Sequence, residues 1–521
     1  MQKVITLKVL PSEAENDLAL RMYAADFLGI DITGITGLEM VKRSIDARGK
    51  KVWITLVVLV FIDEPFSKRT IQTIHFRNVQ NASHQALVIG SGPAGLFASL
   101  KLLEKGIKPV ILERGKEVRA RRRDLAALNK EGIMDPDSNY CFGEGGAGTY
   151  SDGKLYTRST KRGNISRILN LFVQFGADEK ILFDAHPHIG TNKLPQIISA
   201  IREKIIDCGG EFLFGKKVID FIIENNRIKA VKTSDQNLFE AEAIILATGH
   251  SARDIFRLLN DRNILIELKP FALGVRVEHP QQLIDSIQYH AVQRGTFLPP
   301  ASYSLVQQVK GRGVFSFCMC PGGIIAPAAT NAAELVVNGW SPSKRNNPHA
   351  NSGMVVSVEA GDLSAFQKKH GPLAGMYFQQ SVEQKAFVYG GGKFVAPAQR
   401  LIDMVNNKMS SDMPECSYVP GIHSSSMKEV LPGFIYDSLR EAFREFGKKM
   451  KGYLTNEAVV VATESRTSSP VRIPRNSDTL QHPQIKNLYP CSEGAGYAGG
   501  IISAAMDGEK VADAICMQFK V

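Results

Sequence analysis

The stretch QALVIGSGPAGLFASLKLLEKGIKPVILE, residues 85–113, decides the fold of this chain. Its apolar beginning, residues 86–89, predicts a buried strand, and a glycine-rich turn, a helix to residue 105 and a second apolar strand at 110–112 follow. A strand, turn, helix and strand within about thirty residues are typical of parallel sheets that bind dinucleotides. We therefore expect an α/β fold with a Rossmann-type sheet.

The turn has the spacing Gly-x-Gly-x-x-Gly, and Glu113 ends the next strand 23 positions after Gly90. In this context Gly90 allows the tight turn, Gly92 lets the backbone approach a pyrophosphate, and Gly95 lets the helix pack closely on the strand. A carboxylate at that distance holds a ribose 2′-hydroxyl, and it would repel the 2′-phosphate of NADP. The predicted contacts here are Gly90, Gly92, Pro93, Ala94, Gly95, Glu113 and Arg114.

Three further glycine-rich elements follow, at residues 142–149 (FGEGGAGT), 247–249 (ATG) and 492–500 (SEGAGYAGG). Four separated elements indicate one long ligand, and at this point the sequence resembles flavoproteins whose FAD-binding domain is related to glutathione reductase. The resemblance implies FAD as the cofactor, with the positive end of the last helix directed at the flavin. It implies further contacts from Gly145, Gly146, Val218, Thr248, Gly249, Glu493, Gly494, Ala498, Gly499, Gly500 and Ile501.

Five longer motifs narrow the resemblance: FGEGGAGTYSDGKL (142–155), PFALGVRVEHP (270–280), CMCPGG (318–323), ESRTSSPVRI (464–473) and EGAGYAGGI (493–501). Together they are similar to the uncharacterised bacterial FAD-dependent dehydrogenases, which carry a small N-terminal domain before the flavin domain. One departure is Ser492, where the pattern GEGAGYAGG has glycine. The resemblance implies a fold and a cofactor, and it leaves the substrate open.

The chain of 521 residues is long enough for about three domains. Residues 1–82 read as strand, helix, strand and strand, which predicts a small ferredoxin-like α+β domain. The cofactor motifs lie at both ends of the rest, so we expect a discontinuous FAD-binding domain from residues 83–262 and 455–521. Residues 263–454, with many short strands and glycine turns, are expected to form an inserted, mixed β-rich substrate domain.

Composition excludes several classes of protein. The longest apolar run, residues 54–62, is about half as long as a membrane span requires. With no secretory signal and seven cysteines without a CxxC pair, a cytoplasmic protein without a metal site is expected. The net charge of +11 is mild for this length. It includes a basic run at residues 114–123, which is either a solvated helix face or an anion-binding surface beside a phosphate cofactor.

Candidates for catalysis beyond the flavin are few. Cys318 or Cys320 could face the flavin as a thiolate, although a regular strand would hold the two thiols too far apart to bridge and buried cysteines are common packing residues. His188, with His186, could donate a proton, or could be structural. The segment 466–472 offers arginines that suit a carboxylate or phosphate of a substrate, or form structural ion pairs.

The leading hypothesis is a FAD-dependent oxidoreductase that acts on a small organic molecule. A nicotinamide coenzyme (NAD(P)H) that reduced the flavin would have to dock transiently, because no second Gly-x-Gly-x-x-Gly unit is present. The alternative is a nucleic-acid-associated flavoprotein that uses residues 1–82 to bind or modify RNA. Because the excess positive charge is dispersed, neither a nucleic-acid partner nor a membrane is expected.

Overall fold

A parallel sheet of five strands lies at the centre of the computed structural model, which describes residues 1–157 and 163–520. The strand order is β22-β10-β4-β5-β6. Four of these strands come from one part of the chain and the fifth from its C-terminal region: β4 (Gln85–Ile89), β5 (Lys108–Leu112), β6 (Glu211–Leu213), β10 (Ala243–Leu246) and β22 (Leu488–Pro490). The α/β architecture and the discontinuous origin of the sheet agree with the sequence pattern.

This sheet is buried on both faces, which explains why its strands are nearly uninterrupted apolar runs. On one face, Val88, Ile111 and Ile245 pack under helices α2 (Pro93–Lys105), α5 (Leu194–Asp207) and α13 (Ile501–Phe519). On the other face, Leu87 and Leu112 pack against α6 (Arg253–Asp261) and a small antiparallel sheet. That small sheet consists of β7 (Val218–Glu224), β8 (Arg227–Thr233) and β9 (Leu238–Glu240).

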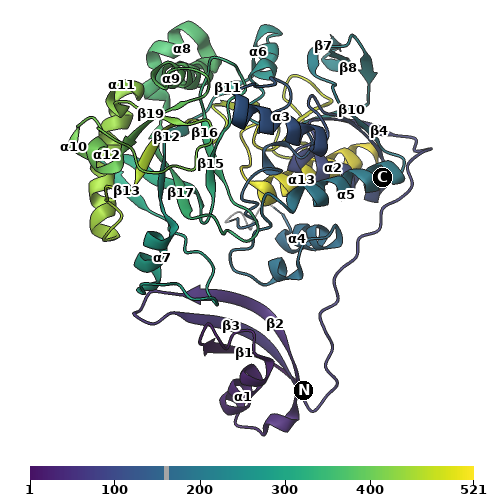
Figure 1. The fold of residues 1–521 in the computed structure, drawn as a ribbon. Helices are drawn as coiled ribbons and strands as arrows, with labels where there is room; N and C mark the ends of the chain where they lie inside the picture. Colours follow the sequence, from purple (N-terminus) through teal and green to yellow (C-terminus); the bar gives the residue numbers. More distant parts are fainter. Residues whose placement is uncertain (158–162, 521) are drawn as a thin grey trace.

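A second, mixed sheet of seven strands stands beside the first, in the order β13-β14-β17-β12-β20-β18-β19 (Figure 1). Its long central strands are β12 (Phe271–Pro280), β14 (Arg312–Cys320) and β17 (His349–Val358). Helices α9 (Ala374–Tyr389) and α12 (Gly433–Lys449) pack on it. The remaining elements are β13 (Val306–Val309), β18 (Ala396–Arg400), β19 (Ile422–Ser424), α7 (Gln281–Tyr289), α8 (Ser364–His370), α10 (Leu401–Asn406) and α11 (Met427–Val430).

One strand of this sheet corrects the sequence-based boundary. Strand β20 (Val459–Glu464) lies between β12 and β18, although residues 455–521 were assigned to the FAD-binding domain. It pairs with β12 antiparallel, for example Val277 with Val460. The chain returns to the five-stranded sheet only at β22. Two short pairs complete the region: β11 (Glu267–Leu268) with β21 (Val471–Arg472), and β15 (Ile324–Pro327) with β16 (Val337–Trp340).

The N-terminal region forms a module of its own, joined to the rest by the extended segment 63–83 (Figure 1). It has β1 (Gln2–Val9), α1 (Asp17–Leu28), β2 (Ile35–Asp46) and β3 (Trp53–Ile62), in an antiparallel sheet ordered β1-β3-β2. A ferredoxin-like fold runs β-α-β-β-α-β. Within residues 1–82, all of which the structure describes, only the first four of these six elements are present, so the module is part of the expected fold.

Among the described residues, no helix has the length and apolar character needed to cross a bilayer. The same residues contain no group of three or more His, Cys, Asp and Glu side chains placed to hold a metal ion.

Candidate cofactor site

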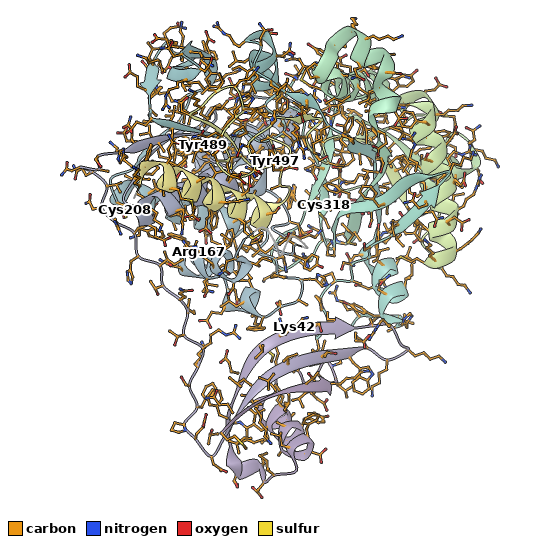
Figure 2. All side chains as sticks on the ribbon, turned by 180° about the vertical axis from the view of Figure 1, so that it is seen from behind. Lys42, Arg167, Cys208, Cys318, Tyr489 and Tyr497 are labelled. Atoms are coloured by element: carbon orange, nitrogen blue, oxygen red, sulfur yellow. The ribbon has the colours of Figure 1, made fainter. Side chains whose placement is uncertain are left out.

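A cavity with about 1540 Å³ of empty space, its open mouth included, lies where the strands of the parallel sheet end. Ile89, Leu112 and Ala247, at the carboxyl ends of β4, β5 and β10, form part of its wall. Phe317 and Cys318 of β14 line it from the seven-stranded sheet. Cys318 is labelled in Figure 2. Crevices at the carboxyl edge of open parallel sheets are where such folds bind ligands.

Most of the residues predicted from sequence to bind the cofactor line this one cavity, although they come from six separate parts of the chain. Those that do are Gly90, Gly92, Pro93, Ala94, Glu113, Arg114, Gly146, Val218, Thr248, Gly249, Glu493, Gly500 and Ile501. Those outside the cavity wall are Gly95, Gly145, Gly494, Ala498 and Gly499. Whether the first group contacts a cofactor stays a prediction.

The predicted glycines fall into two kinds. At Gly95 a Cβ atom would lie 2.0 Å from the carbonyl oxygen of Gly90, and at Gly494 it would lie 2.7 Å from the carbonyl oxygen of Gly249. These two glycines allow close packing of backbone against backbone. At Gly92 the nearest atom to an added Cβ is 4.0 Å away, and at Gly500 nothing lies within 4 Å. Both of these line the cavity, so their missing side chains keep space open there.

The carboxylate of Glu113 is tied into the loops around it. Its Oε2 accepts hydrogen bonds from the backbone N–H of Ser91 (3.0 Å) and from the Ser91 hydroxyl (2.6 Å). Its Oε1 accepts from the backbone N–H groups of Gly115 (2.9 Å) and Gly143 (3.0 Å). The side chain therefore joins the first and second glycine loops, in addition to the ribose contact predicted for it. The sequence offered no signal for this second task.

The basic run 114–123 matches neither of the two interpretations in full, because its arginines lie in different surroundings. Arg114 lines the cavity, where it pairs with Asp137 and Asp254 at 2.9 Å each and lies 4.1 Å from the centre of the Phe142 ring. Arg121 is fully buried, and its guanidinium donates to the carbonyl oxygens of residues 139, 140 and 144. Arg121 thus holds the second glycine loop in place, a role that the sequence reasoning missed.

The N-termini of two helices lie at the cavity. Pro93 and Ala94 begin α2, and Gly500 and Ile501 begin α13. A Cβ on Gly508 of α13 would lie 2.1 Å from the Ala94 carbonyl oxygen, so the two helices are in close contact. Because helix N-termini carry partial positive charge and unpaired N–H groups, this wall of the cavity favours a polyanionic ligand.

The far wall brings together groups from both halves of the molecule. Lys154, which follows the second glycine loop, donates a hydrogen bond to the carbonyl of Met319, beside Cys318. Asp152 lines the same wall and pairs with Arg345 at 2.7 Å. Cys320 lies outside the cavity wall, fully buried. Lys154 and Asp152 stand within the motif at 142–155, but the sequence alone did not single them out.

Two other candidates lie apart from the cavity. The Nε2 atom of His188 lies 3.1 Å from the Ser343 carbonyl oxygen, and burial lowers the pKa of its imidazole; neither His186 nor His188 lines the cavity. Arg466 does line it, but its guanidinium is already bound by Glu383 (3.0 Å) and Glu334 (3.3 Å), so it is a structural ion pair rather than a free anion site. Arg472 is exposed and stacks over the Tyr497 ring.

A parallel sheet whose glycine loops meet at one cavity defines the class of dinucleotide-binding α/β proteins. Comparison with known proteins is consistent with that class. The family model "FAD-dependent protein, C-terminal domain-like" matches residues 270–467, and a domain of unknown function matches residues 1–61. An uncharacterized protein of Clostridium beijerinckii is 39% identical over 505 residues, 93% of each chain. The chain belongs to this family of FAD-dependent proteins.

More distant similarities were also found. A D-amino acid dehydrogenase of Helicobacter pylori is 38% identical over 66 residues, which is 13% of this chain and 16% of that protein. Among solved structures, a glycine oxidase from Bacillus cereus aligns over 84% of this chain and 96% of its own, with 14% identity and a TM-score of 0.30.

Proposed function

We propose that this protein is an oxidoreductase that binds one FAD in the cavity and passes two electrons between the flavin and a small organic molecule. The observation that carries the proposal is the meeting of four glycine-rich elements, far apart in sequence, around a single cavity. Membership of a FAD-dependent family supports the same cofactor.

We expect FAD to lie in one direction along the cavity. Gly92 and the N-terminus of α2 would take the pyrophosphate, and Glu113 and Val218 the adenosine. Gly500 and the N-terminus of α13 would then face the flavin, where their partial positive charge favours the negative charge that reduction adds. FAD bound in this way supplies reversible hydride and electron-pair chemistry. The substrate would reach it beside Lys154 and Cys318.

Purification tests the proposal directly. The protein is expected to be yellow, to show the flavin absorption bands, and to release one FAD per chain when heated. Anaerobic dithionite should bleach these bands and air should restore them. A protein that is colourless and takes up no FAD on reconstitution would contradict the proposal. A flavin that dithionite does not reduce would indicate a binding protein without redox function.

A nucleic-acid partner is not part of this proposal. Three arginines of residues 1–82 are paired with acidic residues: Arg43 with Asp184, Arg69 with Glu39, and Arg48 with Asp46. Binding of RNA by such a surface should be weak. A salt-dependent gel shift with RNA that disappears when residues 1–82 are removed would instead favour the RNA-associated alternative.

A further inference from the structure

Strand β14 is irregular at the point where it passes the cavity. Its pairing with β17 shifts register between Phe317 and Cys320, and Cys318 has a φ of +46°. Positive φ is unusual for a residue with a side chain and marks a bulge that changes where side chains point. The distance expected between thiols two positions apart on a regular strand therefore does not apply here.

The bulge brings the two cysteines of the Cys318-Met319-Cys320 segment together. The Cys320 thiol donates a hydrogen bond to the Cys318 carbonyl oxygen, with its Sγ atom 3.2 Å from that oxygen. Cys318 is half-buried and lines the cavity, whereas Cys320 is fully buried behind it. The Cys318 thiol is thus open to a ligand in the cavity, whereas the Cys320 thiol is not.

Two cations surround this pair. Lys154 donates a hydrogen bond to the Met319 carbonyl between the two cysteines. Arg276 places Nη1 3.9 Å from Cys320 Sγ and Nη2 3.4 Å from the Cys318 carbonyl oxygen. The neighbouring Cys320 thiol, followed by the charges of Lys154 and Arg276, lowers the pKa of Cys318, while the neighbouring Cys318 and burial raise the pKa of Cys320. A thiolate beside a thiol is the reactive form of a dithiol.

We propose that Cys318 and Cys320 are a redox-active pair that cycles between a dithiol and a disulfide and exchanges two electrons with the flavin. This inference rests on the proposed function, since it takes the flavin as the electron partner. Cys318, at the cavity wall, is the sulfur nearest the cofactor, and Cys320 is the partner that completes the bond.

The step balances without any further reagent. The Cys318 thiolate and the Cys320 thiol become joined by a new S–S bond, and the S–H bond of Cys320 breaks. The pair loses two electrons and one proton, and oxidised flavin takes up both. In reverse, two electrons and a proton from reduced flavin restore the thiolate and the thiol. A short ring of this kind is strained, which makes the disulfide easy to reduce.

Peptide mass tests the pair without using the flavin. No lysine or arginine lies between Gly313 and Lys344, so trypsin releases both cysteines in one peptide with no other cysteine. After oxidation of the folded protein with diamide, alkylation in denaturant should leave this peptide unmodified and lighter by two hydrogen atoms. After reduction it should carry two alkyl groups. If both thiols remain alkylated after diamide treatment, the proposal is overturned.

Electron counting tests the link to the flavin. Anaerobic titration of diamide-treated, desalted holoprotein with dithionite should consume four electrons per FAD, two for the flavin and two for the disulfide. Cys318→Ser and Cys320→Ser should each consume two. Cys208→Ser is the control, because Cys208 lies at the end of α5 and does not line the cavity; it should consume four. Consumption of only two electrons per FAD by the unaltered holoprotein would overturn the proposed redox-active cysteine pair while leaving the proposed function intact.

Discussion

The three glycines of the first loop serve different purposes, and the difference is steric. At Gly90 and Gly95, neighbouring backbone leaves no room for a side chain. An added Cβ at Gly90 would lie 2.6 Å from the Ala247 carbonyl oxygen, and one at Gly95 would lie 2.0 Å from the Gly90 carbonyl oxygen. Gly92, between them, meets nothing closer than 4.0 Å. A side chain at Gly92 should therefore fill part of the cavity, and one at Gly95 should destabilise the fold.

Gly92→Val is expected to fold normally and to lose FAD, because its side chain would fill the space that a pyrophosphate needs. We expect affinity to fall at least a hundredfold, or about 2.7 kcal/mol at about 1.4 kcal/mol per decade. FAD content after reconstitution and the melting temperature of the apoprotein measure the two effects. Gly95→Val is the matched control, which should lower the apoprotein melting temperature sharply. A yellow Gly92→Val with unchanged FAD content would show that the cofactor lies elsewhere.

Replacing Glu113 should both weaken FAD binding and destabilise the fold. Glu113→Ala removes the acceptor of four hydrogen bonds and leaves the N–H groups of Ser91, Gly115 and Gly143 without that partner. Hydrogen bonds to a charged group contribute about 1.5–3 kcal/mol each. We expect FAD affinity to fall roughly tenfold to a hundredfold, and the free energy of unfolding of the apoprotein to fall as well. Urea unfolding with and without FAD separates these terms. An unchanged apoprotein stability would contradict the structural part.

At the scale of elements, the sequence predicted what local pattern determines. The expected strand at 86–89, the helix to 105 and the strand at 110–112 correspond to β4, α2 and β5. The pairing of β20 with β12 and the bulge in β14 could not be predicted, because both depend on strands that are distant in the sequence. The cavity's glycine loops, and Cys318 as a candidate beside the flavin, were therefore visible in the sequence, whereas Lys154 was not.

A buried ionic cluster joins elements of the two sheets. The sequence offered structural ion pairs as one interpretation of Arg466, but not the partners of that residue. Arg253 of α6 and Arg466, which follows β20, both bind Glu383 of α9, at 2.8 and 3.0 Å. Both also bind Glu334, at 3.1 and 3.3 Å. All four side chains are buried. Removing one partner of a buried pair leaves an uncompensated charge, which costs about 3–5 kcal/mol.

Glu383→Gln should therefore destabilise the protein by about that amount at neutral pH. Burial acts to raise the pKa of Glu383, but Arg253 and Arg466 outweigh it and lower the pKa from 4.5 to about 2. A depressed pKa gives stability that is present above pH 4.5 and is lost as pH falls towards 2. The difference in unfolding free energy between the native protein and the variant should thus shrink between pH 5 and pH 3.

Urea unfolding across that range provides the measurement. Glu441→Gln, on the exposed side of α12, is the control and should change the unfolding free energy little at any pH. A Glu383→Gln effect that does not vary with pH would contradict the argument.

At the scale of the whole molecule, the N-terminal module stands apart from the cavity. The cavity-lining residues lie between Ile89 and Ala504, and none belongs to residues 1–82. One contact of the module with the rest is Arg43, whose N–H donates to the Phe183 carbonyl at 2.8 Å and whose carbonyl accepts from Ala185 at 2.9 Å. Ala47 and Val52 of the module also pack against the larger core, and Leu298 packs against the core of the module. The Arg43 guanidinium also pairs with Asp184 at 2.7 Å.

Cutting the linker should therefore leave the flavin in place. A protease recognition sequence inserted after Thr70, which is exposed, allows cleavage of the folded holoprotein at one position. Because the ion pairs at this contact are partly exposed and contribute only about 0–1 kcal/mol each, and salt screens them, the N-terminal fragment should separate in high salt. Gel filtration with absorbance at the flavin bands should find all of the FAD with the larger fragment, as in the uncut insertion protein. Loss of flavin on cleavage would show that the module supports the cofactor site.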